Sequence, residues 1–361
     1  MKILCFHPAL APYRVDFFNR LAERVELKIL FLQHNLMTQK FDQKALRSEL
    51  KCCHAELTHG FDIRQRAFRF GVMRAVQRES PDVVFSYEAS PVTLQLCILK
   101  KLHLIKARIW TFMDDSPVQV RSRNGMRRFI RDWVVRNVEK VIVPSQAAAA
   151  AYLVGNTQLA DSRFSVIPII HDTVMMRRNS REVYSMGKAW RREHCPQGWT
   201  RIMLFVGRLA EIKNIPWLID RLAELPTATG FVIVGDGPME PLLKEKVAEM
   251  GLENRIVFAG RKSGDELYAI MAASDLLVLA SKSETFGAVV AEALQWGTPC
   301  VVSDNCGVAV LIEDGKNGEV FKYDDKLGFV DACKRVPHRS GESFLTVELK
   351  DSVSALVGSC I

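Results

Sequence analysis

Short apolar runs alternate with amphipathic segments along the whole chain. The apolar runs have the length of buried strands, and the segments between them have helical spacing. Strands alternating with helices indicate βα units in parallel sheets, and the number of apolar runs is large enough to form two sheets. In the first half, strands are predicted at 2–6, 26–32, 82–87, 107–112, 140–143 and 164–167, and helices at 14–24, 66–78, 91–101, 125–137 and 146–153. In the second half, strands are predicted at 202–206, 231–234, 255–258, 275–279 and 300–302.

The alternation is interrupted once, between His171 and Thr200. A chain of 361 residues is also long for a single hydrophobic core. We therefore predict one domain over residues 1–172, an interdomain connection over 173–199 and a second domain over 200–361. Within the second domain, residues 342–356 are expected to form only a short helix.

Composition narrows the class of protein. Hydrophobic residues make up 48% of the chain and charged residues 25%, as in ordinary soluble globular proteins. The nine cysteines include no Cys-x-x-Cys spacing, which favours reduced thiols and a cytoplasmic location. No apolar run approaches the roughly 20 residues that a membrane helix needs.

Two glutamates stand eight positions apart around a predicted strand–helix junction. Glu284 lies in a polar loop after the strand at 275–279, and Glu292 lies among small apolar residues of a helix predicted over 286–296. In parallel α/β sheets, ligands bind at the carboxyl ends of strands and anions at helix N-termini. The alternative is that Glu284 only caps the helix and Glu292 only faces solvent.

A second motif follows the strand at 202–206. Gly207 and Arg208 form a turn, and Lys213 precedes the next predicted helix. A reaction in which a phosphate group departs leaves negative charge on that group. An arginine fork and a lysine point charge stabilise that charge more in the transition state than in the ground state. Alternatively, Arg208 and Lys213 are solvated loop charges.

Taken together, the two motifs resemble those of retaining glycosyltransferases of group 1, also called family 4, which are common in polysaccharide and lipopolysaccharide biosynthesis. Phe286 and Gly287 follow the first glutamate as in that family, and Gly297-Thr298-Pro299 follows the helix. The resemblance is strong over residues 201–336 and rests on the βα pattern alone in the N-terminal half. It implies an α/β fold of the GT-B type, with two facing Rossmann-like domains and a cleft between them.

The resemblance also implies roles for individual residues. The N-terminal domain would bind the acceptor and the C-terminal domain the nucleotide sugar. Arg208 and Lys213 would bind the diphosphate, Glu292 the ribose hydroxyls, and Glu284 the sugar ring as the principal catalytic residue. The other positions expected at the nucleotide sugar are Gly207, Gly235, Gly237, Arg261, Phe286 and Gly287. Without the resemblance, the Gly235–Gly237 pair reads equally well as an ordinary turn.

The N-terminal half departs from the family pattern at two loops. Tyr13 and Arg14 stand where many members have a Gly-Gly loop, and they are expected on the acceptor side. Met113 replaces a histidine common in the family, and Asp114 and Asp115 follow it. Either aspartate could orient an acceptor hydroxyl as a catalytic residue, or could simply cap the loop. We do not expect a metal site there, because donor binding in this fold usually needs no metal.

Positive charge is concentrated in residues 121–140, which carry seven of the basic residues of a chain with a net charge of +8. Apolar side chains interleave with them at helical spacing. Such a helix can lie on an anionic membrane surface, or it can be half-buried with a solvated face. No nucleic-acid recognition motif accompanies these charges, and a nucleic-acid partner is not expected.

The resemblance implies a retaining, metal-independent hexosyltransferase that uses a nucleotide sugar as co-substrate and needs no other cofactor. A UDP-sugar is expected in preference to a GDP-sugar. The acceptor would be a glycan, a lipid-linked molecule or a small molecule, and the protein would be cytoplasmic, with a peripheral position on the inner face of the membrane as an option. Two alternatives stay open: a sugar-nucleotide 2-epimerase of similar fold, and a non-catalytic nucleotide-binding relative that assists a partner. A dinucleotide-dependent dehydrogenase is disfavoured, because no G-x-G-x-x-G follows the first strand of either half.

Overall fold

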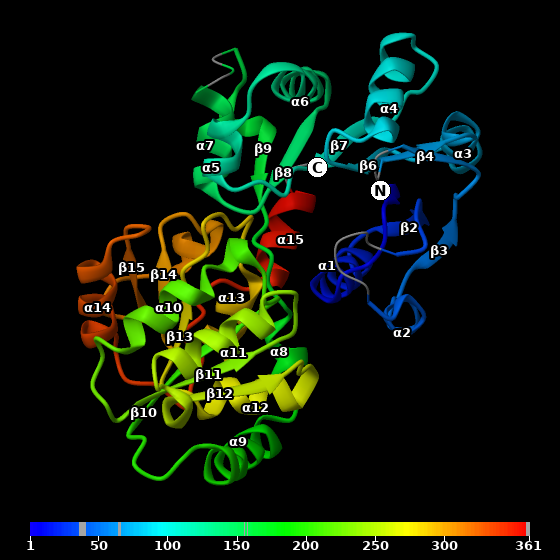
Figure 1. The fold of residues 1–361 in the computed structure, drawn as a ribbon. Helices are drawn as coiled ribbons and strands as arrows, with labels where there is room; N and C mark the ends of the chain where they lie inside the picture. The colour runs from blue at the N-terminus through cyan, green and yellow to red at the C-terminus, as the bar shows by residue number, and fades with distance from the viewer. Residues whose placement is uncertain (36–40, 64–65, 155, 157, 359–361) are drawn as a thin grey trace. The chain divides into compact units, whose positions relative to one another are not determined.

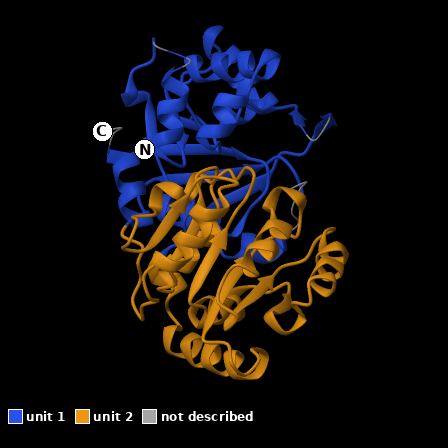
Figure 2. Ribbon diagram, turned by 60° about the vertical axis from the view of Figure 1, so that its left-hand side comes forward, with its two compact units in different colours: residues 1–172, 347–361 blue, residues 173–346 orange. Residues whose placement is uncertain are grey.

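The computed structural model describes residues 1–35, 41–63, 66–154, 156 and 158–358. The chain divides into two compact units, coloured separately in Figure 2. Unit 1 comprises Met1–Asp172 and Val347–Ile361, and unit 2 comprises Thr173–Thr346.

Unit 1 contains a parallel sheet of seven strands in the order β3-β2-β1-β6-β7-β8-β9 (Figure 1). Its central strands are almost entirely apolar, as expected when helices cover both faces of a parallel sheet. The strands of this sheet are β1 (Lys2–His7), β2 (Glu26–Phe31), β3 (Cys53–Glu56), β6 (Val83–Tyr87), β7 (Arg108–Phe112), β8 (Lys140–Val143) and β9 (Phe164–Val166).

The helices of unit 1 alternate with these strands. Four of them, α3, α4, α6 and α7, contribute buried side chains to one hydrophobic core cluster. Proline at the first helical position begins α1, α4 and α5, and Ser90 and Ser116 cap α4 and α5. The helices are α1 (Pro12–Ala22), α2 (Gln43–Ser48), α3 (Val72–Glu79), α4 (Pro91–Lys101), α5 (Pro117–Ser122), α6 (Gly125–Asn137), α7 (Gln146–Val154), the 3-10 helix η1 (Asp161–Arg163) and α15 (Leu349–Gly358).

The helix predicted at 66–78 is wrong in its first part. Residues Gly60–Ile63 (β4) and Arg66–Arg69 (β5) form an antiparallel hairpin, and only Val72–Glu79 is helical. Gly71 separates the two elements with φ of 83°. The buried Arg69 side chain holds the hairpin in place by donating to the carbonyl oxygens of Leu32 and Phe61 at 2.8 and 3.1 Å.

Unit 2 contains a parallel sheet of six strands in the order β12-β11-β10-β13-β14-β15. The strand order reverses beside β10, so the carboxyl ends of β10 and β13 form the topological switch point where ligands bind in such sheets. The strands are β10 (Arg201–Val206), β11 (Thr229–Val234), β12 (Ile256–Gly260), β13 (Leu276–Leu279), β14 (Cys300–Ser303) and β15 (Gly318–Phe321).

The helices of unit 2 also follow the βα pattern, and α13 (Ala288–Gln295) directly follows the loop that contains Glu284. The others are α8 (Thr173–Met176), α9 (Ser180–His194), α10 (Ile215–Leu222), α11 (Glu240–Glu249), α12 (Gly264–Ala273), α14 (Lys326–Arg335) and the 3-10 helices η2 (Glu211–Lys213), η3 (Glu253–Arg255) and η4 (Gly307–Leu311). Among the described residues, no helix combines the length and the apolar character that crossing a bilayer requires.

The units differ from the predicted domains at two segments. The predicted connection at 173–199 is part of unit 2, because α9 packs on α12 and buries Val183 and Trp190. The last segment of the predicted C-terminal domain belongs to unit 1. There, α15 packs against α1 and buries apolar side chains that include Leu349 and Val353. A short helix was predicted in this segment, but the sequence pattern alone did not assign it to the first unit.

Candidate active site

The loops at the carboxyl edge of the unit 2 sheet are joined by backbone hydrogen bonds. The N–H of Gly207, after β10, donates to Val234 O at 3.0 Å, and the N–H of Leu209 donates to Asp236 O at 2.8 Å. Gly235 has φ of 138°, and a Cβ there would lie 1.9 Å from Gly207 O. A Cβ on Gly237 would lie 2.4 Å from Leu209 O. Any side chain at either glycine would therefore separate these loops.

Lys213 and Glu284 form an ion pair between the loop after β10 and the loop after β13. Lys213 is the last residue of η2, and its side chain is 21% exposed; that of Glu284 is 18% exposed. The sequence motifs separate these residues by 71 positions, yet the fold brings their charged groups into contact. This contact was not predicted. In the sequence, both residues follow predicted strands, but only the structure shows that these two strands are neighbours in the sheet.

The loop that carries Glu284 is fixed by the segment after β14. Glu284 N–H donates to Asn305 O at 3.3 Å, and Glu284 O accepts from Gly307 N–H at 3.1 Å. Phe286 is buried, and Gly287 precedes the first residue of α13 with φ of 97°. Burial, followed by the nearby Glu284 carboxylate, raises the pKa of the Cys306 thiol to about 12, so that thiol stays protonated at neutral pH.

The other predicted residues of unit 2 lie around these loops. Arg208 is exposed directly after Gly207, and Arg261 is exposed after β12. Glu292 is half-buried on α13, two turns from Gly287, between the buried Ala291 and Ala293. Unit 2 thus contains every residue predicted at the nucleotide sugar, but their roles as ligands of the nucleotide sugar stay predictions.

In unit 1, Arg14 and Asp114 form an ion pair in which one guanidinium nitrogen contacts both carboxylate oxygens. Arg14 Nη2 lies 2.7 and 2.6 Å from the two oxygens of Asp114, and Tyr87 donates its hydroxyl to Asp114 at 3.0 Å. Burial lowers the pKa of Arg14, but the neighbouring Asp114 outweighs it and the net shift is upward. Tyr13 is next to this pair, and burial raises the pKa of its phenol. Tyr13 and Arg14, which were predicted on the acceptor side, therefore adjoin Asp114, one of the two aspartates predicted to be catalytic.

Asp115 lies in a different environment from Asp114. Its side chain is 2% exposed and pairs with Arg123, Arg131 and the hydroxyl of Tyr152. Burial pushes the pKa of Asp115 up, but the hydrogen bond from Arg123 and the charge of Arg131 hold it below its usual value. These contacts favour a structural role for Asp115, the loop-anchoring alternative considered from the sequence, and a catalytic role has no support among them.

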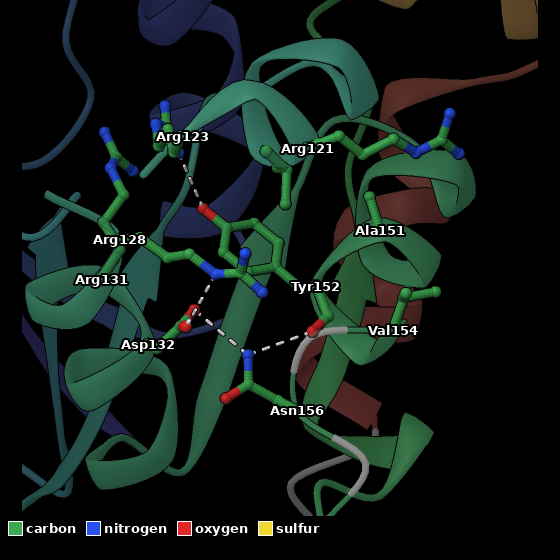
Figure 3. Close-up of a pocket in the computed structure, with 10 residues that line it drawn as sticks. Arg121, Arg123, Arg128, Arg131, Asp132, Ala151, Tyr152, Val154 and Asn156 are labelled. Atoms are coloured by element: carbon green, nitrogen blue, oxygen red, sulfur yellow. Dashed lines mark hydrogen bonds and ion pairs between the residues drawn. The ribbon is translucent and has the colours of Figure 1, made fainter. Parts of the chain in front are cut away.

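A small cavity of 170 Å³ adjoins this cluster (Figure 3). Its wall includes Arg121 and Arg128, and Arg128 Nε faces the carboxylate of Asp132 at 3.6 Å. Asn156 donates to Asp132 at 3.2 Å and to the backbone oxygen of Tyr152 at 3.2 Å. The polar groups seen in Figure 3 therefore largely satisfy one another.

Residues 188–341 match the family model described as glycosyl transferases group 1. Among curated proteins, the chain is 38% identical over 139 residues to alpha-D-kanosaminyltransferase of Streptomyces kanamyceticus, covering 37% of this chain and 36% of that protein. It is 28% identical over 271 residues to N-acetyl-alpha-D-glucosaminyl L-malate synthase of Bacillus anthracis, covering 71% of this chain and 65% of that protein. The matched region thus spans between about a third and two thirds of these relatives.

Solved structures resemble the chain over its whole length. The lipopolysaccharide outer core galactosyltransferase WaaB, in its apo form, has a TM-score of 0.73 at 19% identity and covers 100% of both chains. The Anabaena protein Alr3699/HepE in complex with UDP-glucose has a TM-score of 0.68 at 18% identity, over 99% of this chain and 100% of that chain. This likeness confirms the α/β fold of the GT-B type that the sequence predicts.

Proposed function

We propose that this chain, whose residues 188–341 match the family model of the group 1 glycosyl transferases, transfers a hexosyl group from a UDP-sugar to an acceptor hydroxyl with retention of configuration. The observation that carries the proposal is the Lys213–Glu284 ion pair at the carboxyl edge of the unit 2 sheet. The pair supports the proposal because the cation that we propose for the diphosphate is in contact with the carboxylate that we propose for the sugar.

Each residue contributes a separate interaction in this proposal. Lys213 and Arg208 neutralise the diphosphate and stabilise the charge that develops when the bond to the sugar breaks. Glu292, on α13, accepts hydrogen bonds from the ribose hydroxyls. Glu284 accepts from a hydroxyl of the sugar ring, an interaction that strengthens as the ring gains positive charge.

The group transfer requires no nucleophile from the protein. The bond between the anomeric carbon and the phosphate oxygen breaks, and the acceptor oxygen attacks from the same face. The departing phosphate oxygen takes the proton of the acceptor hydroxyl, so the products are the glycoside and the nucleoside diphosphate. The two cations supply the charge stabilisation that a divalent metal gives other transferases, which is why we propose a metal-independent reaction without a further cofactor.

The choice of UDP is supported by relatives of the same fold. The HepE structures are complexes with UDP, with UDP and glucose, and with UDP-glucose. The acceptors named in relatives include malate and inositol 3-phosphate, while WaaB is a transferase of the lipopolysaccharide outer core. We therefore keep a glycan, a lipid-linked molecule or a small molecule as the acceptor class of this chain.

The experiment is a screen for slow donor hydrolysis in the absence of acceptor. Radiolabelled UDP-glucose, UDP-galactose, UDP-N-acetylglucosamine and GDP-mannose are incubated with the purified protein and with Lys213→Ala. We expect release of free sugar from one UDP-sugar by the wild type and a loss of at least tenfold in the variant. An epimerised nucleotide sugar as product would instead support the 2-epimerase, and no turnover together with UDP binding would support the non-catalytic alternative.

We also propose that α6 lies on an anionic membrane surface. This helix exposes Met126 and Phe129, which are 71% and 66% exposed, beside the exposed Arg127 and Arg128. Arg131 on the same helix is directed inward and pairs with Asp115 and Glu88 at 2.8 and 2.6 Å. Only part of the basic charge in residues 121–140 is therefore available to lipid, and a peripheral position would depend on apolar side chains as well as on charge.

A further inference from the structure

Unit 1 contains a pocket of 560 Å³ at the carboxyl edge of its own sheet. Pro8 follows β1, Gln33 follows β2 and Glu88 follows β6, so three neighbouring strands end at its wall. Strand β5, the start of α4 and helix α6 complete the wall. The carboxyl edge of a parallel sheet is where α/β domains bind ligands, and unit 1 has no nucleotide-binding role in the proposed function.

Arginine dominates the charge of this pocket. Arg66, Arg123, Arg127 and Arg131 all line it, and the carboxylates facing them are Glu88 in the wall and Asp115 behind it. Four guanidinium groups thus face two carboxylates. The excess positive charge favours an anionic ligand, and the guanidinium fork matches the oxygens of a phosphate or a carboxylate.

Two of these arginines are held in position before any ligand binds. Asp115 accepts from Arg123 Nη1 at 2.6 Å and from Arg131 Nη1 at 2.8 Å. Arg131 Nη2 also donates to Glu88 at 2.6 Å. A guanidinium has five donors, so these contacts fix the side chains and still leave N–H groups for a ligand.

The other two arginines lie at the mouth of the pocket. Arg66, on β5, and Arg127, on α6, are exposed, and within the ranges that the structure describes neither forms an ion pair. Long exposed side chains with unused charge can close on a ligand that enters between them. Arg128, which is adjacent to Arg127 in the sequence, differs from both because it faces Asp132 and lines the separate cavity of Figure 3.

Glu88, which lines the same pocket, has a strained backbone conformation. Glu88 has φ of 51°, a left-handed conformation that costs a residue with a side chain free energy and that occurs preferentially at functional sites. Its N–H donates to Phe112 O at 2.7 Å, and its carbonyl accepts from the Thr111 hydroxyl at 3.2 Å, so the conformation is fixed from both sides. The Glu88 carboxylate is thereby held in the wall, where it can accept a hydrogen bond from a ligand hydroxyl.

We infer that this pocket binds the acceptor through a phosphate group, and that the acceptor is a phosphorylated, hydroxyl-bearing molecule. The inference rests on the proposed function, because it identifies the ligand of unit 1 as the acceptor of the transfer. Arg66 and Arg127 hold the outer phosphate oxygens, Arg123 and Arg131 hold the inner ones, and Glu88 orients a neighbouring hydroxyl.

The test is calorimetric titration of the full chain with glucose 6-phosphate, glucose and glucuronate, in the presence of saturating UDP. The UDP occupies the nucleotide site of unit 2, so a phosphate cannot bind there. We expect glucose 6-phosphate to bind at least tenfold tighter than glucose. Arg66→Ala and Arg127→Ala should each weaken it roughly tenfold, the loss typical of one charge-assisted contact.

Arg128→Ala is the matched control, because it removes the same charge one residue away from Arg127 on the same exposed helix. It should leave the affinity for glucose 6-phosphate unchanged, and UDP affinity should be unchanged in all three variants. Equal affinities for glucose and glucose 6-phosphate, or equal losses in Arg127→Ala and Arg128→Ala, would overturn the inference. Tighter binding of glucuronate would overturn the phosphate assignment in favour of a carboxylate.

A failure of the phosphate-binding inference can be distinguished from a failure of the proposed function. Failure to bind UDP with normal phosphate binding in unit 1 would contradict the glycosyltransferase proposal alone. Normal UDP binding and donor hydrolysis without any preference for glucose 6-phosphate would contradict the phosphate pocket alone.

Discussion

The most discriminating perturbation is Glu284→Gln, because this residue contacts Lys213 directly. In the absence of ligand, the Glu284 carboxylate neutralises the lysine that is proposed to bind the diphosphate. A diphosphate must then compete with that carboxylate for the same ammonium group. Replacing the carboxylate by a neutral amide of the same size removes the competition and keeps the shape of the loop.

The magnitude follows from the environment of the pair. Two unit charges about 4 Å apart interact by about 1 kcal/mol in water and about 4 kcal/mol at an effective dielectric constant of 20. Because the two side chains are 21% and 18% exposed, we take a net value near the lower end, roughly 1–2 kcal/mol. Glu284→Gln should therefore leave UDP affinity unchanged or raise it by up to about thirtyfold.

Lys213→Ala should act in the opposite direction. It removes a charge-assisted contact worth about 1.5–3 kcal/mol, so UDP affinity should fall roughly tenfold to a hundredfold. Both variants should lower the turnover of the donor, by roughly tenfold to a thousandfold, which is the cost of one lost transition-state interaction. Glu284→Gln should thus lower donor turnover without lowering UDP affinity, whereas Lys213→Ala should lower both.

The assay is calorimetry with UDP, together with donor hydrolysis, on the two single variants and the double variant. Lys246→Ala is the control, because Lys246 is 26% exposed and pairs with Asp220 at 2.6 Å on another part of unit 2. In the double variant, the effects should be non-additive by roughly 0.5–3 kcal/mol, as for any two groups in contact. If Glu284→Gln weakens UDP binding as strongly as Lys213→Ala, the carboxylate is holding the nucleotide and the assignment of the two roles is wrong.

Three further predictions concern other parts of the molecule. Asp115→Asn should lower the midpoint of thermal unfolding by roughly 6–20 °C at neutral pH, because breaking a buried ion pair by removing one partner costs about 3–5 kcal/mol. The pKa of Asp115 is depressed in the folded state. The wild type should therefore keep this stabilisation above about pH 4 and lose it only as the pH falls through the folded-state pKa. Glu292→Gln should weaken UDP binding, measured by calorimetry, by roughly tenfold, and an unchanged affinity would remove Glu292 from the nucleotide site. Binding to anionic vesicles should fall as salt rises and should be lost in Phe129→Ser with Arg128→Glu, whereas absence of wild-type binding at low salt would favour a solvated face for α6.

The unit 2 half of the fold was predictable because its elements have strong local signals. The strand predicted at 202–206 is β10 (Arg201–Val206), and the helix predicted at 286–296 is α13 (Ala288–Gln295). Gly297 follows with φ of 73°, as expected of a residue that ends a helix. Continuous apolar runs, glycine turns and helix ends are properties of neighbouring residues, so they can be read from the sequence.

The parts that were missed depend on contacts between distant residues. Arg66–Arg69 has the composition of an exposed helix, but it becomes strand β5 because the Arg69 side chain reaches carbonyl groups of β4 and of the segment after β2. Asp115 is adjacent to Asp114 in sequence, yet one is buried among arginines and the other pairs with Arg14. A pair of aspartates in a loop predicts neither partner, so the structure was needed to separate their environments.

The same limit applies to basic residues. The seven basic residues between 121 and 140 look alike in the sequence, which does not show which of their charges can be reversed without disturbing the fold. In the structure, Arg131 bridges Asp115 and Glu88. Replacing it by an acidic residue would therefore place a third carboxylate beside these two. A test of surface charge on this helix has to leave Arg131 unchanged.

The return of α15 to unit 1 has a consequence for how the protein is made. Unit 2 is one continuous stretch, Thr173–Thr346, and can fold as soon as it leaves the ribosome, whereas unit 1 lacks α15 until residues after 347 have been synthesised. At about 5–20 residues per second, the delay between the end of the first segment and the arrival of α15 is roughly 10–35 s. Throughout that time the surface of α1 that α15 later covers is exposed to water and to other nascent chains. Helix α15, which is translated after unit 2, therefore completes a unit whose other elements are translated before unit 2, and a chain truncated before residue 347 would expose the apolar surface that α15 covers on that unit.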